Sequence, residues 1–273
     1  MRSVQSAQAS PALRPFVRAF AQRTLTDTFQ AQPMPAFLET VLHFDFNDVL
    51  TIQSADGSCE AGSPMSLVGP HTHTCTSLLF QGTIDSFAIF LEPTALWPLF
   101  RVPISTIVDT FYDSTDVLGA SLSTLWNVLA ETTNFLDRIR ISETFLLRQL
   151  ALERGAATIA TTAGSLLTRR AGRITIVDLA SHVNVSVREL ERLFIQDMGI
   201  TPKRFARVAR FQAALDAKVG SPDKSWLDIA VNAGYHDQMH LIHEFESFCG
   251  FSPTLTMGRL GDSRPQALAS SHD

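Results

Sequence analysis

The 273-residue sequence predicts an α+β fold, with a small β-barrel or sandwich in the N-terminal half and helices in the C-terminal half. Short apolar runs bounded by Gly, Pro or Asp follow one another as far as residue 108. After Pro93, apolar residues recur every three to four positions, as they do along one face of a helix. A repeated pattern within residues 178–253 predicts two helix-turn-helix units joined by a linker helix.

The expected strands lie between Phe16 and Val108. Apolar and polar side chains alternate within 36–47, and 48–54 is expected to form the next strand before the turn dipeptide Asp56-Gly57. Further strands are expected at 66–69, 76–81 and 86–91. Helices are expected at 94–100, 116–130 and 134–155, and 156–164 is either a linker or a short helix. We therefore expect a regulatory domain over 1–160, a helical domain over 165–258 and a disordered tail over 259–273.

The repeat consists of two segments about fifty residues apart. Residues 178–202 read DLASHVNVSVRELERLFIQDMGITP, and residues 228–253 read DIAVNAGYHDQMHLIHEFESFCGFSP. The first three residues of each match at an offset of 50, and four later positions match at an offset of 51, so one residue has been added near the second turn. Those four pairs are Leu190 and Leu241, Phe194 and Phe245, Gly199 and Gly250, and Pro202 and Pro253. Each copy has the outline of a helix, a short turn and a second helix that stops at Gly.

Helix starts in this region carry capping signals. A hydroxyl residue stands three positions before a carboxylate at Thr175, Ser186 and Ser225, Thr201 precedes Pro202, and Asp237 can cap the second helix of the second copy. These signals predict helices near 166–171, 176–182, 187–197, 202–218, 226–232, 238–248 and 253–258.

The charge of the chain is unevenly distributed. The formal net charge is −5, yet residues 165–218 contain ten Lys and Arg against five Asp and Glu. Residues 219–257 contain one basic residue against five acidic ones. A local basic face is typical of a DNA-binding surface, so we expect the first unit to supply most of the affinity.

The repeated segment resembles the C-terminal domain of the AraC/XylS (arabinose-regulator) transcription factors. The resemblance rests on DLA, LERLF, GITPKRF, Arg210 and Ala214 in the linker helix, DIAVNAGYHDQMHLIHEF and GFSP. The DQ-x-H-x-I sequence of the second copy is similar to a subgroup whose N-terminal domain is a cupin-like β-barrel. Residues 67–74 (LVGPHTHT) fit such a domain as well. The second unit departs from the pattern in HEFESF, where relatives commonly carry basic residues.

The resemblance implies a sequence-specific transcriptional regulator whose recognition helices are 187–197 and 238–248. Their expected base contacts are Val187, Arg188, Glu191, Arg192, Gln238, Met239, His240, Ile242 and His243. Arg can pair with guanine and Glu with cytosine in the major groove. The expected phosphate contacts are Ser186, Lys203, Arg204 and Arg207. Alternatively, Arg188 and Arg192 pair with nearby glutamates, His240 packs within the fold and Arg210 forms an internal ion pair.

Double-stranded DNA is therefore the expected partner, and RNA polymerase is a second candidate. The N-terminal domain is expected to bind a small-molecule effector, to form a homodimer, or both. Its aromatic residues either line a pocket or form plain core: Phe44, Phe46, Phe80, Phe87 and Phe90. The sequence has neither a signal peptide nor a long uncharged apolar run, so a cytoplasmic protein without a membrane partner is expected.

The main alternative is a cupin-like metal-dependent enzyme that uses His71 and His73. Two His residues at i and i+2 on a strand face the same side and could share a metal ion. No HExxH motif completes the set, and His43 and Glu92 are the nearest candidates. We therefore expect no metal, no cofactor and no enzyme activity. A second alternative, suggested by the acidic second unit, is an interaction protein that does not bind DNA.

Overall fold

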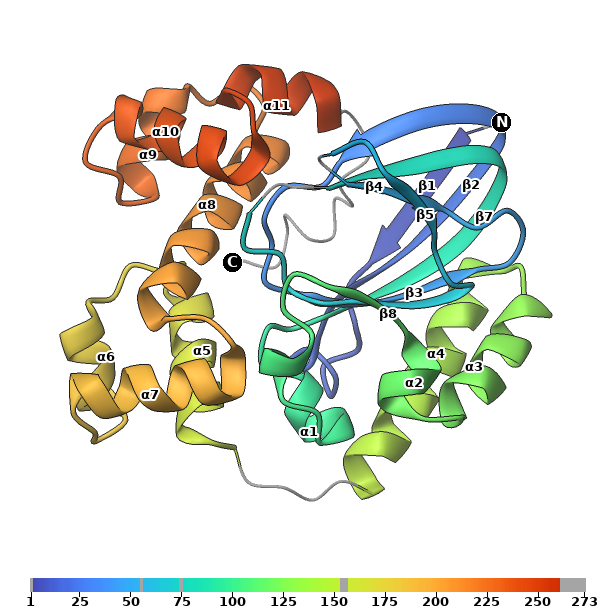
Figure 1. The fold of residues 1–273 in the computed structure, drawn as a ribbon, viewed down its shortest axis with the longest axis horizontal. Coiled ribbons are helices and arrows are strands. Elements are labelled where there is room, and N and C mark those ends of the chain that lie inside the picture. Colours follow the sequence, from blue (N-terminus) through green and yellow to red (C-terminus); the bar gives the residue numbers. More distant parts are fainter. Residues whose placement is uncertain (1, 55, 74–75, 153–156, 261–273) are drawn as a thin grey trace.

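The computed structural model describes residues 2–54, 56–73, 76–152 and 157–260. A sheet-rich N-terminal half lies beside a helical C-terminal half, and the two halves are in extensive contact (Figure 1). Within the described residues, no helix has the length and apolar character needed to cross a membrane.

Eight strands of the described ranges form one antiparallel sheet. In chain order they are β1 (Arg2–Ala7), β2 (Val17–Pro33), β3 (Thr40–Asp45), β4 (Thr51–Ser54), β5 (Cys59–Ala61), β6 (Met65–Val68), β7 (Thr76–Leu91) and β8 (Phe111–Asp113). The main path runs β1-β2-β7-β3-β6-β8, and β4 pairs with β5 and with β7. The expected sheet-rich N-terminal half is confirmed. Its described edges β1 and β8 do not pair with each other, so the sheet is open rather than a closed barrel. Strands of 17 and 16 residues beside strands of three lack the matched lengths and stagger that close a barrel.

Strand β7 joins two runs that the sequence separates. Residues 81–85 contain Gly82 and polar neighbours, which is typical of a turn, yet they pair with β2. Opposite this segment, β2 has a register shift between Leu25 and Thr28. Such a shift interrupts the alternation of apolar and polar residues, so the sequence does not show that β7 is one long strand. Strands β1, β5 and β8 are short and were also not expected.

The two faces of the sheet have different surroundings. Phe20, Phe44 and Phe87 lie in the main core together with Leu122 and Leu125 of α3. Helices α1 (Leu96–Phe100), α2 (Ser114–Leu118), α3 (Ser121–Ala130) and α4 (Phe135–Leu152) form the helical part of this half. The helix expected over 116–130 is divided, because the backbone at Gly119 takes a positive φ of 86°. The opposite face carries a smaller apolar cluster of Val41, Val68 and Ala88.

Seven helices make up the C-terminal half as far as it is described: α5 (Ile159–Arg169), α6 (Ile176–His182), α7 (Val187–Met198), α8 (Pro202–Gly220), α9 (Trp226–Asn232), α10 (Gln238–Cys249) and α11 (Pro253–Leu260). Every expected N-cap is confirmed, because Thr175, Ser186, Thr201, Ser225 and Asp237 each accept a backbone N–H from the residue three positions on. Residues 159–164 are helical rather than a linker, since Thr158 caps α5 seven residues before the expected start. Most of the expected tail, 261–273, lies outside the described residues.

Candidate DNA interface and effector pocket

The two sequence copies fold into two helix-turn-helix units of the same design. Helices α6 and α7 form the first unit, α9 and α10 form the second, and α8 runs between them (Figure 1). Leu190 and Phe194 of α7 are fully buried, as are their counterparts Leu241 and Phe245 of α10. Both second helices end on a glycine in the left-handed conformation. The repeat therefore specifies the same local packing twice.

The expected base contacts on α7 are all exposed: Val187, Arg188, Glu191 and Arg192. Arg192 is already engaged, because its guanidinium binds both carboxylate oxygens of Glu189 at 2.7 and 2.9 Å and also Gln196 at 3.2 Å. Hydrogen bonding within this pair lowers the pKa of Glu189 and raises the pKa of Arg192. Arg188 forms no ion pair with a described residue. The alternative of a glutamate partner therefore holds for Arg192 and not for Arg188.

On α10, the expected contacts Gln238, Met239, His240 and His243 are exposed, and Ile242 is half-buried. The side chain of Asp237 accepts the backbone N–H of His240 at 2.7 Å, which lowers the pKa of Asp237. The imidazole of His240 meets the ring of Tyr235 edge-on. His243 lies 3.5 Å from Glu246. The alternative packing role of His240 is thus partly realised, although its side chain still reaches the surface.

The four expected phosphate contacts have different environments. Ser186 and Lys203 are exposed. Arg204 instead donates to the backbone carbonyl of Thr72 in the N-terminal half, and burial lowers its pKa. The Nε of Arg207 donates to Glu244 at 2.6 Å. No local pattern in the sequence could reveal these partners, because they are more than thirty positions away.

A concave surface lies between the two units. It is lined by Lys203, Arg207 and Arg210 of α8, by His240, His243 and Glu244 of α10, and by the loop that leads into α6. Arg210 donates to the backbone carbonyl of Gly172 at 3.2 Å, so its internal partner is a carbonyl rather than a carboxylate. Four of the basic side chains here were expected DNA contacts from the sequence. The fold therefore brings together candidates from two separate helices.

The N-terminal half contacts both recognition helices at their C-terminal ends. Ser105 Oγ donates to the carbonyl of Gln196 in α7 at 2.7 Å. The backbone N–H of Ala36 donates to the carbonyl of Phe248 in α10 at 2.8 Å. The opposite ends of these helices, which carry the expected base contacts, stay exposed. Recognition helices read bases mainly with their N-terminal residues, so these contacts leave the reading ends accessible.

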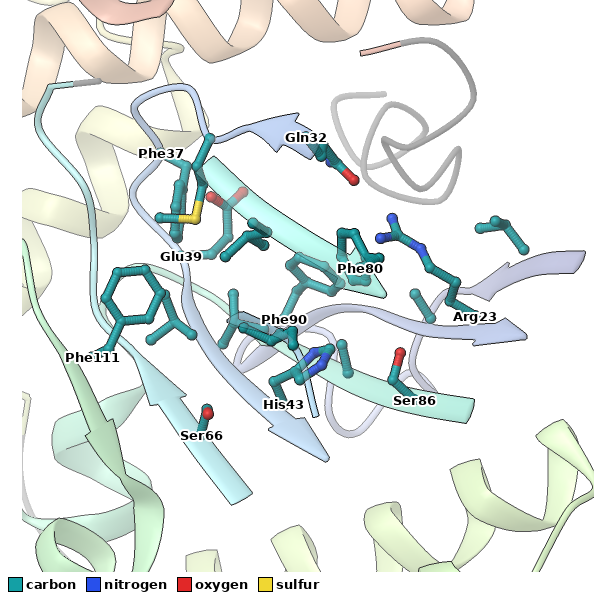
Figure 2. Close-up of a pocket in the computed structure, with 18 of the residues that line it drawn as sticks. Arg23, Gln32, Phe37, Glu39, His43, Ser66, Phe80, Ser86, Phe90 and Phe111 are labelled. Carbon is teal, nitrogen blue, oxygen red and sulfur yellow. The ribbon is translucent and has the colours of Figure 1, made fainter. Parts of the chain in front are cut away.

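A pocket of about 170 Å³ lies on the sheet face that carries the smaller apolar cluster. Figure 2 shows its side chains pointing into one space from β2, β3, β6 and β7. Its aromatic wall consists of Phe37, Phe80, Phe90 and Phe111. Of the aromatic residues expected either to line a pocket or to form core, Phe80 and Phe90 line the pocket, whereas Phe44 and Phe87 belong to the main core and Phe46 packs against it. The size is comparable with an engineered cavity of about 150 Å³ that binds benzene.

The polar side chains of the pocket are few. Arg23 lies with its guanidinium 4.4 Å from the ring centre of Phe80, and Glu39 occupies another part of the wall (Figure 2). His43 lines the same space and bonds Asp45 at 3.1 Å. The amide oxygen of Gln32 is buried without a hydrogen-bond partner among the described residues. An apolar body with a polar end matches this lining.

The histidines at 71 and 73 have different surroundings. His71 is 1% exposed, stacks on Phe37 and meets Phe111 edge-on, and its Nδ1 lies 2.9 Å from the carbonyl of Gly69. Burial lowers the pKa of His71. The side chain of His73 is half exposed. Residues 72–73 form a bend, so the strand on which the metal-site alternative depended is not formed at these positions. No three His, Cys, Asp or Glu side chains in the described ranges are arranged to hold a metal ion.

The sheet-rich half thus contains a ligand-sized pocket, and the helical half contains two helix-turn-helix units joined by one linker helix. A helix-turn-helix domain model matches residues 179–259. No curated protein matches the chain.

Solved structures of ToxT from Vibrio cholerae share the fold. One is 10% identical, with 96% of this chain and 98% of that chain covered and a TM-score of 0.52. An apo ToxT variant from strain SCE256 is 9% identical, with 93% and 100% covered and a TM-score of 0.53. ToxT bound to (E)-4-(8-methylnaphthalen-1-yl)but-3-enoic acid is 10% identical, with 95% and 98% covered and a TM-score of 0.51. These likenesses show the fold: a helix-turn-helix domain, matched over residues 179–259, follows a sheet-rich half as in the ToxT structures.

Proposed function

We propose that the chain regulates transcription by reading two adjacent major-groove segments of DNA with α7 and α10. The observation that carries this proposal is the pair of equally capped units whose N-terminal recognition ends are both exposed. Reading two successive grooves on one face of B-DNA requires a separation of about 34 Å, one helical turn. Helix α8, which begins at the first unit and ends at the second, supplies a rigid spacer for this purpose.

We assign base reading first to Arg188. It is exposed on α7, and among the described residues it has no carboxylate partner to leave before it meets a guanine. Arg192 must release Glu189 first, so its contribution to affinity is smaller. Val187 and Glu191 lie beside Arg188, and Gln238, Met239, His240, Ile242 and His243 form the corresponding set on α10.

We assign the DNA backbone to the concave surface between the units. Lys203, Arg207, His240 and His243 face it from two helices, and Ser186 adds a hydroxyl at the start of α7. Phosphate contacts of this kind position the protein without reading sequence. Arg204 joins them only if its bond to Thr72 opens.

Replacing Arg188 by Ala tests the DNA-reading proposal. Fluorescence anisotropy with DNA from upstream of the chain's own gene, and with single-base variants of it, should show relaxed preference at one position. Loss of a bidentate contact corresponds to about 1–3 kcal/mol of discrimination. Arg140→Ala is the matched control, because Arg140 is an exposed arginine of α4 in the N-terminal half. A uniform loss of affinity on every sequence would make Arg188 a phosphate contact, and no DNA binding by the unaltered protein would refute the proposal.

We further propose that the sheet pocket binds a small apolar organic acid as effector. One ToxT structure holds (E)-4-(8-methylnaphthalen-1-yl)but-3-enoic acid, an aromatic body with one carboxylate. The pocket of this chain supplies four aromatic rings and the guanidinium of Arg23 for such a molecule. Titration with that acid, followed by tryptophan fluorescence or calorimetry, measures the binding. Arg23→Met should weaken it, whereas absence of binding would remove this class of ligand.

The remaining partners follow from the same proposal. We place the protein in the cytoplasm, where it would meet DNA and RNA polymerase. We divide the chain into a regulatory domain that ends near residue 160 and a DNA-binding domain over 165–258.

Exposed apolar residues on α3 and α4 favour a homodimer through these helices: Val128, Leu136, Leu147 and Leu152. Sedimentation of the purified chain tests this, and a monomer at all concentrations would exclude it.

A further inference from the structure

Glu39 lies where the pocket meets the linker helix. It precedes strand β3 and forms part of the pocket wall (Figure 2). One of its carboxylate oxygens accepts a hydrogen bond from the amide of Gln212 in α8 at 2.6 Å. The amide oxygen of Gln212 in turn accepts the backbone N–H of Leu38 at 3.0 Å. A single side chain therefore joins the effector site to the helix that spaces the two reading units.

Arg18 forms a second connection between Glu39 and α8. Arg18 of β2 binds Glu39 through one guanidinium nitrogen, and through the other it binds Asp216 of α8 at 2.5 Å. Gln212 and Asp216 are four residues apart, so both lie on the face of α8 that meets the sheet. The four side chains are buried, with 1–7% of their surfaces exposed. Burial alone lowers the pKa of Arg18, but the carboxylates of Glu39, Asp216 and Glu92 outweigh burial and leave the pKa above its ordinary value.

The charge of this cluster makes it sensitive to the pocket. Arg18 supplies one positive charge, whereas Glu39 and Asp216 supply two negative charges in surroundings where charges interact strongly. A carboxylate held by Arg23 elsewhere in the same pocket adds a further negative charge to the surroundings of Glu39. Gln212 and Asp216 lie in the second half of α8, near α9 and α10, so a shift there moves the second unit relative to the first.

We infer that Glu39 transmits occupancy of the pocket to the linker helix, so that an anionic effector changes DNA affinity through the Glu39–Gln212 and Arg18–Asp216 contacts. The inference rests on the effector site proposed above. A ligand shifts a conformational equilibrium only by its difference in affinity between the two states. Glu39 supplies that difference, because it contacts the pocket and α8 at once.

Reciprocal coupling between acid and DNA tests the inference. The probe is (E)-4-(8-methylnaphthalen-1-yl)but-3-enoic acid, and the full chain is titrated with DNA with and without it. In the unaltered protein we expect the probe to change the Kd for DNA at least about fivefold, and DNA to change the Kd for the probe by the same factor. Glu39→Gln alters the pocket wall and with it the affinity of this variant for the probe, but the factor compares the same variant with and without DNA, so it should still fall to within about twofold of one.

Two further variants separate coupling from folding. Gln212→Met acts from the α8 side, so it should lose coupling while it retains the probe affinity of the unaltered protein. Ser105→Ala is the control, because it removes a hydrogen bond between the two halves that does not involve the pocket. It should keep the coupling factor unchanged.

The results of these experiments separate this inference from the two proposals on which it depends, effector binding and DNA binding. Full coupling in folded Glu39→Gln and Gln212→Met, or probe binding without any effect on DNA, overturns the inference alone. Failure to bind the probe overturns it together with the effector proposal and leaves the DNA proposal standing. Failure to bind DNA refutes the DNA proposal.

Discussion

At the scale of single residues, two kinds of polar contact stabilise the molecule: caps within one helix, and buried hydrogen bonds between elements that are far apart in the sequence. The five helix caps could be predicted because each depends on a hydroxyl or carboxylate and a backbone N–H three positions away. Arg204 was expected to face DNA, yet it binds the carbonyl of Thr72, 132 positions away. Arg18, Glu39 and Gln212 were missed for the same reason. A buried polar cluster assembled from three elements leaves no spacing pattern in the sequence.

His71 gives a prediction for stability against pH at this scale. Burial lowers its pKa, so the unfolded chain takes up a proton before the folded chain does. Stability should therefore fall as the pH is lowered through the ordinary titration range of histidine, near 6.5. His71→Phe should show a smaller loss of melting temperature between pH 7.5 and pH 5.5. His73→Gln, at a half-exposed position, should behave like the unaltered protein. Equal slopes in all three would contradict the account.

At the scale of elements, periodicity predicted helices better than strands. Helices α6 to α10 lie within two residues of their expected bounds, since apolar spacing and caps agree along each. Strand β7 is longer than either of the two runs expected within it, because β2 pairs with a polar segment that resembles a turn. Whether the sheet closes into a barrel could not be predicted, since closure depends on which strands meet and alternation carries no information about that.

The end of α7 gives a prediction for this scale. Gly199 has a φ of 72°, and a Cβ added there would lie 2.8 Å from Val108 and 2.9 Å from Ser105 in the N-terminal half. Gly199→Ala should cost about 1–2 kcal/mol for the left-handed backbone and about 1–3 kcal/mol more for the crowding. Gly234→Ala is the matched control, because Gly234 has a similar φ of 77° and a Cβ added there would meet only the side chain of Arg173, at 3.4 Å. Thermal denaturation should show a larger decrease for Gly199→Ala, and equal decreases would refute the crowding.

At the scale of the whole molecule, the charge distribution limits how DNA is held. The basic surplus lies in residues 165–218, whereas the second unit is acidic, and Arg204 and Arg207 are occupied by internal contacts. The concave surface between the units was not predictable as a shape, although four of its basic residues were expected to contact DNA. Sequence identifies the candidates, and only the packing of α8 shows that they share one surface.

A shallow salt dependence follows from this distribution. Each phosphate that is neutralised contributes about −0.9 to the slope of log K against log salt. With few free cations at the described interface, the slope should stay shallower than about −5. Anisotropy titrations between about 50 and 300 mM salt give the value. A slope near −9, which corresponds to about ten phosphates, would contradict this description.

The N-terminal half contacts the C-terminal ends of both α7 and α10, and this limits how parts of the chain can be exchanged. Ala36 and Ser105 meet backbone carbonyls of α10 and α7, so each half is fitted to the surface of the other. A chimera with the N-terminal half of one protein and the C-terminal half of a relative would have poorly fitting surfaces at these two contacts. Such a chimera should therefore fold well only when the residues on both sides of each contact come from the same protein.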